Sequence, residues 1–285
     1  MKRSGTIGQI RNLLLLIALS LMGCSMTMVR PLAEKHTADI GGHKLEYVMA
    51  GEGSPVIVFL SGYGADIDTS WSRVYPAAKK ISTVFAYNRF GYGASDKVVQ
   101  PQTGAVIVNS LRDILRENGL MPPYVLVGHS LGGVYANLFA RQYPHEVSGV
   151  VLIDSSHPDQ LEMMRSRQGP IRQAMTGVIW MIDSVLHRAR HSEITSFDET
   201  ASQIKKAGPF PDIPLVVITA GKEPPSWLIG AEGIRIHQIN QKSLVTLSPQ
   251  GKQIIAEKSG HFVQNDEPEI VIQAIHDITD KARGK

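Results

Sequence analysis

The chain has 285 residues, of which 29 are Lys or Arg and 26 are Asp or Glu, and its formal net charge is +3. This near balance of charge, with no cluster of basic side chains, does not favour a nucleic-acid-binding surface, and we expect no nucleic-acid partner. Cys24 is the single cysteine, which excludes an intrachain disulfide.

The N-terminus has the pattern of a signal peptide. Three basic residues, Lys2, Arg3 and Arg11, precede an apolar run over residues 13–21. That run is shorter than the roughly 20 apolar residues that cross a bilayer, and it fits the h-region of a signal peptide. Removal of residues 1–23 would take away these three basic side chains and no acidic ones, which leaves the remaining chain without formal net charge.

The four residues from Leu21 to Cys24 (L-M-G-C) resemble the lipobox of bacterial lipoproteins, with Met22 as a mild departure. The resemblance implies a signal peptide over residues 1–23 and a diacylglycerol on the thiol of Cys24. The protein would then be lipid-anchored to a membrane of the bacterial cell envelope. Ser25 after the cysteine favours the outer membrane in a cell that has two. In the alternative, the segment is an ordinary secretory signal and Cys24 is incidental.

A tether over residues 24–36 precedes one domain over residues 37–285, which is long enough for a single large core. After a hairpin over residues 40–50, apolar runs alternate between the patterns of strands and helices. They are strands at 55–60 and 83–87, a helix at 106–117, a strand at 124–127, a helix at 131–142, strands at 147–153, 214–219 and 253–256, and a closing helix at 268–281. This alternation predicts an α/β fold, with helices on both faces of a mostly parallel central sheet.

The segment over residues 155–212 interrupts the alternation. It is long, helix-prone and rich in methionine, with Met163, Met164, Met175 and Met181. Inserted after a strand, it would lie as a helical cap above the carboxyl edge of the sheet. Its methionines could form an adaptable apolar wall for an acyl chain, or they could simply join the helices of the cap to one another.

The pentapeptide Gly128–Gly132 (G-H-S-L-G) joins a predicted strand to a predicted helix. A G-x-S-x-G sequence in that position is typical of a nucleophile elbow. The glycines leave room for a tight turn that strains the serine backbone and presents the hydroxyl above the edge of the sheet. Ser130 is therefore the candidate nucleophile.

A serine nucleophile needs a base, and His261 is the candidate among ten histidines. It follows the last predicted strand and precedes the closing helix, so its loop can reach back to the elbow. His187 and His191 have the i, i+4 spacing of a metal-binding pair, but the glutamate of H-E-x-x-H is missing between them. We therefore expect neither a metal site nor a cofactor.

Three segments besides the elbow carry a family resemblance. Ser61–Gly64 lies at the place of an H-G-x-G loop, Asn88–Ser95 is similar to a D-x-R-G-x-G-x-S turn, and Gly260–Glu269 matches the region of a catalytic histidine. From about His43 to its C-terminus, the chain resembles the α/β-hydrolase superfamily. The resemblance implies the α/β-hydrolase fold and the chemistry of a serine hydrolase.

The resemblance also implies the roles of the site residues. Ser130 would be the nucleophile and His261 the base, and the backbone N–H groups of Tyr63 and Leu131 would form the oxyanion hole. Ser61 is a departure, because the family usually has histidine at that position. The oxyanion donor is a backbone group, so we expect the hole to survive this change.

Two residues satisfy the family's chain order for the triad acid, in which an Asp or Glu lies between the serine and the histidine. Asp154 directly ends the strand at 147–153 and resembles acids placed after the sixth strand. Glu223 follows the strand at 214–219, the more usual location, but it is longer and leads into two prolines. We favour Asp154 and keep Glu223 as the alternative.

A serine at the elbow excludes the dehalogenases and epoxide hydrolases of this family, which use aspartate there. The expected reaction is hydrolysis of a small or medium-sized carboxylic ester through an acyl-enzyme. Amidase, peptidase, acyltransferase, C–C hydrolase and perhydrolase chemistry would use the same residues. A non-catalytic envelope lipoprotein that binds a small apolar ligand is a further alternative, and retention of both Ser130 and His261 argues against it.

Overall fold

The computed structural model describes residues 31–32, 34–165, 187–224 and 226–284. The predicted signal peptide, Cys24, most of the predicted tether, Met175 and Met181 lie outside the described residues. Within the described part of the chain, no helix is both long enough and apolar enough to cross a membrane.

The described residues form an eight-stranded sheet with the order β1-β2-β4-β3-β5-β6-β7-β8. The strands are β1 His36–Asp39, β2 Lys44–Ala50, β3 Val56–Leu60, β4 Val84–Tyr87, β5 Tyr124–His129, β6 Val147–Ile153, β7 Leu215–Ala220 and β8 Gly251–Ala256. β1 pairs with β2, and β2 with β4, in antiparallel fashion, while every other pair is parallel. The carboxyl ends of β3 to β8 therefore meet at one edge.

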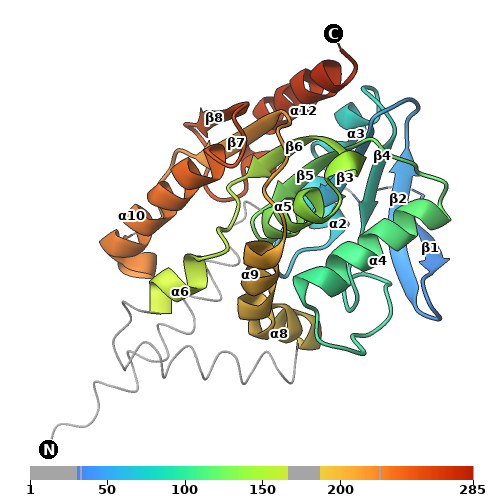
Figure 1. Ribbon diagram of the computed structural model, residues 1–285, viewed down its shortest axis with the longest axis horizontal. Coiled ribbons are helices and arrows are strands. Elements are labelled where there is room, and N and C mark those ends of the chain that lie inside the picture. The colour runs from blue at the N-terminus through green and yellow to red at the C-terminus, as the bar shows by residue number, and fades with distance from the viewer. Residues whose placement is uncertain (1–30, 33, 166–186, 225, 285) are drawn as a thin grey trace, which may run out of the picture. The chain divides into compact units, whose positions relative to one another are not determined.

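Helices cover both faces of the sheet (Figure 1). On one face lie α4 Gly104–Glu117, α5 Leu131–Gln142 and α9 Phe197–Lys206. On the other lie α2 Ile67–Trp71, α3 Tyr75–Ala78, α11 Val263–Asp266 and α12 Pro268–Ala282. The remaining helices are α6 Gln160–Arg165, α8 Arg188–Thr195 and α10 Ser226–Val245, with a 3-10 turn at Pro144–Glu146.

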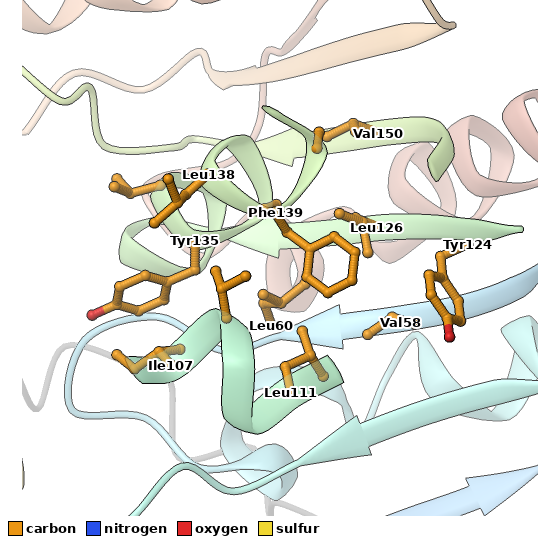
Figure 2. Packing of buried hydrophobic residues seen from close by; sticks show 14 of the residues in the cluster. Val58, Leu60, Ile107, Leu111, Tyr124, Leu126, Tyr135, Leu138, Phe139 and Val150 are labelled. Atoms are coloured by element: carbon orange, nitrogen blue, oxygen red, sulfur yellow. The ribbon is translucent and has the colours of Figure 1, made fainter. Parts of the chain in front are cut away.

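The helix that follows the elbow is the most deeply buried of the set. Every residue of α5 from Leu131 to Ala140 is buried. Figure 2 shows Tyr135 and Phe139 of α5 between the strands and the side chains of Ile107 and Leu111 from α4. Packing on both sides fixes α5 against the sheet, so the residue at its N-terminus is held on a rigid element.

The predicted α/β architecture, with a mostly parallel sheet and helices on both faces, is confirmed, with element boundaries shifted by a few residues. The main element that the sequence did not predict is α10. Two interior glycines, Gly230 and Gly233, weaken its helical signal, each by about 1 kcal/mol, and its apolar residues form no single stripe. Tertiary contacts with α6, β7 and β8 support the helix instead.

The described parts of the segment predicted as a cap are helical, in α6, α8 and α9. However, α9 also belongs to the main core, where Phe197 and Ile204 pack with α4 and α5. The side chains of Thr200 and Gln203 accept hydrogen bonds from the backbone N–H groups of Gly104 and Ala105, each at 2.8 Å. They thereby satisfy two of the unpaired donors at the N-terminus of α4.

Candidate active site

Ser130 lies in the tight turn between β5 and α5. Its φ of +52° is rare for a residue with a side chain, and its N–H donates to the Ile153 carbonyl at 3.0 Å. A Cβ on Gly128 would come within 2.7 Å of the Gly133 backbone, and one on Gly132 would collide with a carbonyl oxygen at the end of β3. The glycines of the elbow are therefore required because helix and strand approach so closely.

His261 lies in the loop between β8 and α11 and reaches the elbow. Its Nε2 is 3.0 Å from Ser130 Oγ, and its Nδ1 is 2.6 Å from Asp154 Oδ2. With the proton on Nδ1, the imidazole donates to the carboxylate and leaves Nε2 to accept from the serine hydroxyl. Ser130 is 9% exposed and the His261 side chain is 46% exposed, so solvent can reach the candidate base.

Asp154 follows the last residue of β6, with a φ of +39° and 3% exposure. Its N–H donates to the Ile218 carbonyl of β7 at 2.7 Å. While Oδ2 contacts His261, Oδ1 lies 2.9 Å from His237 Nε2 and 3.1 Å from the backbone nitrogen of Ala220. Burial by itself would raise the pKa of Asp154, but the hydrogen bonds from His237 and His261 outweigh it and hold the pKa well below the ordinary value.

The alternative acid, Glu223, has a different environment. It is exposed after β7, and its Oε1 accepts a hydrogen bond from Gln238 Nε2 at 2.7 Å. The structure therefore brings Asp154 rather than Glu223 to the Nδ1 side of His261.

His237 of α10 is a site residue that sequence reasoning missed. Burial lowers the pKa of His237, but the Asp154 carboxylate outweighs that effect and the net shift is upward. No local motif surrounds His237, and the helix that carries it was itself not predicted. The only available signal was a histidine placed between the seventh and eighth strands, where an acid was expected.

His129, the variable residue before the nucleophile, is also part of the site. Burial and the nearby His261 lower the pKa of His129 to about 3, so it is neutral at physiological pH. Its Nε2 lies 2.9 Å from the backbone oxygen of His261, and the two rings lie 4.7 Å apart between centroids. His129 therefore holds the backbone of the loop that carries the candidate base.

The predicted oxyanion loop lies against Ser130, the candidate nucleophile. A Cβ on Gly62 would be 3.3 Å from Ser130 Cβ, which shows how closely the loop approaches the elbow. Leu131 is the first residue of α5, where a backbone N–H has no intrahelical acceptor. Ser61, at the start of this loop, accepts a hydrogen bond from Trp71 Nε1 at 3.0 Å. Tyr63 follows in the turn and is exposed.

The i, i+4 pair considered as metal ligands does not lie on one helix, because His187 precedes α8 and His191 lies within it. Over the described residues, no three or more His, Cys, Asp or Glu side chains are grouped as they would be around a metal ion.

Comparison with known proteins identifies the fold. A family model described as alpha/beta hydrolase fold matches residues 55–178. Uncharacterized protein YqjL of Bacillus subtilis (strain 168) is 26% identical over 238 residues, which cover 80% of this chain and 85% of YqjL. The chain spans only 18 to 38% of the length of several other curated relatives.

Solved structures give the same architecture. A thermophilic esterase from Thermogutta terrifontis is 21% identical, with a TM-score of 0.59 over 88% of this chain and 99% of the esterase. The epoxide hydrolase CorEH is 19% identical, with a TM-score of 0.58 over 87% of this chain and 99% of the hydrolase. The chain therefore has the α/β-hydrolase fold, on which these two proteins are named for different reactions.

Proposed function

We propose that the protein is a serine hydrolase that cleaves a carboxylic ester of a small or medium-sized substrate through an acyl-enzyme. The observation that carries this proposal is the hydrogen-bonded series from Ser130 Oγ through the His261 ring to Asp154. Nucleophile, base and orienting acid are within the distances that acyl transfer needs, and the base contacts both partners at once.

In the proposed reaction, Ser130 Oγ attacks the ester carbonyl while its proton passes to His261 Nε2. The negative charge that develops on the carbonyl oxygen is stabilised by the N–H groups of Tyr63 and Leu131. Collapse of the tetrahedral intermediate releases the alcohol, which takes the proton from His261. A water molecule, activated by the same histidine, then cleaves the acyl-enzyme. Asp154 keeps His261 in the required tautomer and stabilises its charged form.

Three observations favour this reaction over its alternatives. A serine at the elbow attacks a carbonyl carbon and forms an acyl-enzyme, whereas an aspartate there would attack the alkyl carbon of a haloalkane or an epoxide. The His261 side chain is 46% exposed, so water can reach the proposed base, as the hydrolytic step requires. A protein that only binds a ligand has no use for a buried carboxylate held against a histidine whose other nitrogen contacts a serine, because burial of that charge costs stability.

We propose, in addition, that the protein is anchored to the bacterial cell envelope by a lipid on Cys24. The L-M-G-C sequence after a short apolar run supports this. Incorporation of labelled palmitate by cells that express the chain, and its loss in Cys24→Ser, is the expected result. Labelling that persists in Cys24→Ser would contradict it.

The function is tested by hydrolysis of p-nitrophenyl esters from acetate to palmitate, with the full-length protein in detergent. We expect turnover that peaks at one chain length and disappears in Ser130→Ala. Ser148→Ala is the matched control, because Ser148 lies at the opposite end of the parallel strands, where its hydroxyl bonds the Tyr124 carbonyl. Turnover of esters that survives in Ser130→Ala would refute the ester assignment. So would a wild-type protein that cleaves p-nitroanilides in a Ser130-dependent way but does not cleave the esters.

A further inference from the structure

Arg89, in the turn after β4, connects the predicted oxyanion loop to helix α8. It is 4% exposed, and its guanidinium donates from Nη1 to the Ser61 carbonyl at 2.7 Å and from Nη2 to the Gly62 carbonyl at 2.9 Å. The other edge of the guanidinium faces Glu193 of α8, with Nε 2.5 Å from Oε1 and Nη2 3.2 Å from Oε2. One cation therefore binds two consecutive carbonyl oxygens and a carboxylate.

The surroundings hold this cation in one place. Burial by itself would lower the pKa of Arg89, but the Glu193 carboxylate outweighs it, so the guanidinium stays charged. Tyr92 donates from its hydroxyl to Glu193 Oε2 at 2.9 Å. The guanidinium carbon lies 5.0 Å from the ring centroid of Tyr92 and 5.5 Å from that of Tyr135. These contacts leave the fork of Arg89 little freedom to turn.

The carbonyl that Arg89 binds belongs to a chemically important peptide. The Gly62 C=O and the Tyr63 N–H are part of the same planar peptide unit and point in opposite directions. A donor that fixes the carbonyl therefore also fixes the direction of the N–H. A positively charged donor further polarises the peptide, which makes its N–H a stronger hydrogen-bond donor.

We propose that Arg89 is a positioning residue that fixes and polarises the Gly62–Tyr63 peptide as an oxyanion donor, and that Glu193 holds Arg89 in place from α8. This inference rests on the proposed serine hydrolase function. Arg89 does not touch the substrate and acts only through the peptide. A purely structural ion pair would instead stabilise the fold without changing how the site treats a tetrahedral intermediate.

Arg89→Lys is the primary test, because lysine keeps the charge beside Glu193 but cannot span two carbonyls and a carboxylate with one nitrogen. Loss of an oxyanion donor lowers kcat by roughly 100- to 1,000-fold, so a misdirected donor should lower it by about 10- to 100-fold. We expect KM to stay within about threefold, since the peptide acts mainly on the transition state.

An alkyl boronic acid reports on the tetrahedral state directly. Ser130 Oγ adds to boron, its proton passes to His261, and the resulting anionic boronate presents an oxygen to the oxyanion hole. In Arg89→Lys, the inhibition constant should rise by the same factor by which kcat/KM falls. Arg112→Lys is the matched control, because Arg112 forms an ion pair with Glu146 away from the elbow. It should leave both quantities unchanged.

Arg89→Met/Glu193→Leu removes both buried charges together, which avoids an unpaired charge in the core. This double variant should lower kcat and weaken boronate inhibition at least as much as Arg89→Lys does. It provides the test if the lysine variant does not fold. Wild-type kcat, or lowered kcat with an unchanged boronate constant, in the folded variant would overturn the proposal.

A fluorophosphonate separates this outcome from failure of the proposed function. It forms a P–O bond to Ser130 with loss of fluoride. If the wild-type protein neither reacts with it nor turns over esters, the serine hydrolase assignment itself fails. If the wild type reacts and Arg89→Lys reacts equally fast, only the role of Arg89 is refuted.

Discussion

Replacing Asp154 with asparagine removes one charge from the centre of the site while preserving the shape of the side chain. The backbone at this position has a φ of +39°, a region that asparagine tolerates better than most residues. The Ala220 N–H and His237 can still donate to an amide oxygen at Oδ1. We therefore expect Asp154→Asn to fold, and the effect to fall on His261.

The size of that effect follows from the contact at Oδ2. The carboxylate oxygen accepts a hydrogen bond from His261 Nδ1 at 2.6 Å. An amide NH2 at the same place would face the Nδ1–H, and two hydrogen-bond donors cannot pair. The ring must then adopt the other tautomer, with a proton on Nε2, and it can no longer accept from Ser130. A wrong tautomer of this kind lowers kcat by roughly 10⁴-fold, or about 5 kcal/mol of transition-state stabilisation.

The assay is kcat for the preferred p-nitrophenyl ester from pH 6 to 10, with thermal unfolding measured in parallel. Glu223→Gln is the matched control, and its kcat should stay within about twofold of wild type, because Glu223 is exposed and bonds Gln238. A large loss of kcat in Glu223→Gln, together with a near-normal kcat in Asp154→Asn, would refute the assignment of Asp154 as the acid.

Three further results are expected. His237→Leu removes one donor from Asp154 and should lower kcat about tenfold with little change in KM, and His237→Gln should restore part of the loss. Gly132→Ala should lower the free energy of unfolding by about 3 kcal/mol in urea titrations, whereas Gly208→Ala, which meets no atom within 4 Å, should be neutral. The depressed pKa of His129, about 3 against 6.5 when unfolded, gives stability that is fully present above pH 6.5 and declines towards pH 3, by roughly 5 kcal/mol in total. If the free energy of unfolding of His129→Gln depended on pH in the same way as that of the wild type, the depressed pKa of His129 would not be the cause.

The sequence predicted those features that a local pattern marks, either a motif or the position of a residue at the end of a strand. The elbow around Ser130 needs a strand, a glycine-flanked serine and a helix in succession, and all three lie within twenty residues. His261 was identified by its place after the last strand. Asp154 was favoured for its place at the end of a strand, and it lies against His261 in the structure.

The features that the sequence did not predict depend on contacts between distant segments. His237 reaches Asp154 across 83 positions, and Glu193 reaches Arg89 across 104. Neither residue stands in a motif, and a charged side chain on a short helix is ordinarily solvated. The amphipathic pattern of α9 likewise does not reveal whether its apolar face covers a substrate or, as for Phe197, the core of the sheet.

The backbone hydrogen bonds at the carboxyl edge of the sheet have a consequence for how activity responds to heat. The Ser130 N–H bonds to the end of β6, and the Asp154 N–H bonds to β7, so the spacing of nucleophile and acid is set by the interstrand distance of about 4.8 Å. His261 instead lies on a loop outside the sheet, where the contact of its carbonyl with His129 Nε2 holds the backbone. Of the three proposed triad residues, Ser130 and Asp154 are therefore fixed by the sheet, and His261 is not. On warming, we expect the loop that carries His261 to open before the sheet unfolds. Turnover should then decline reversibly several degrees below the temperature at which the sheet unfolds.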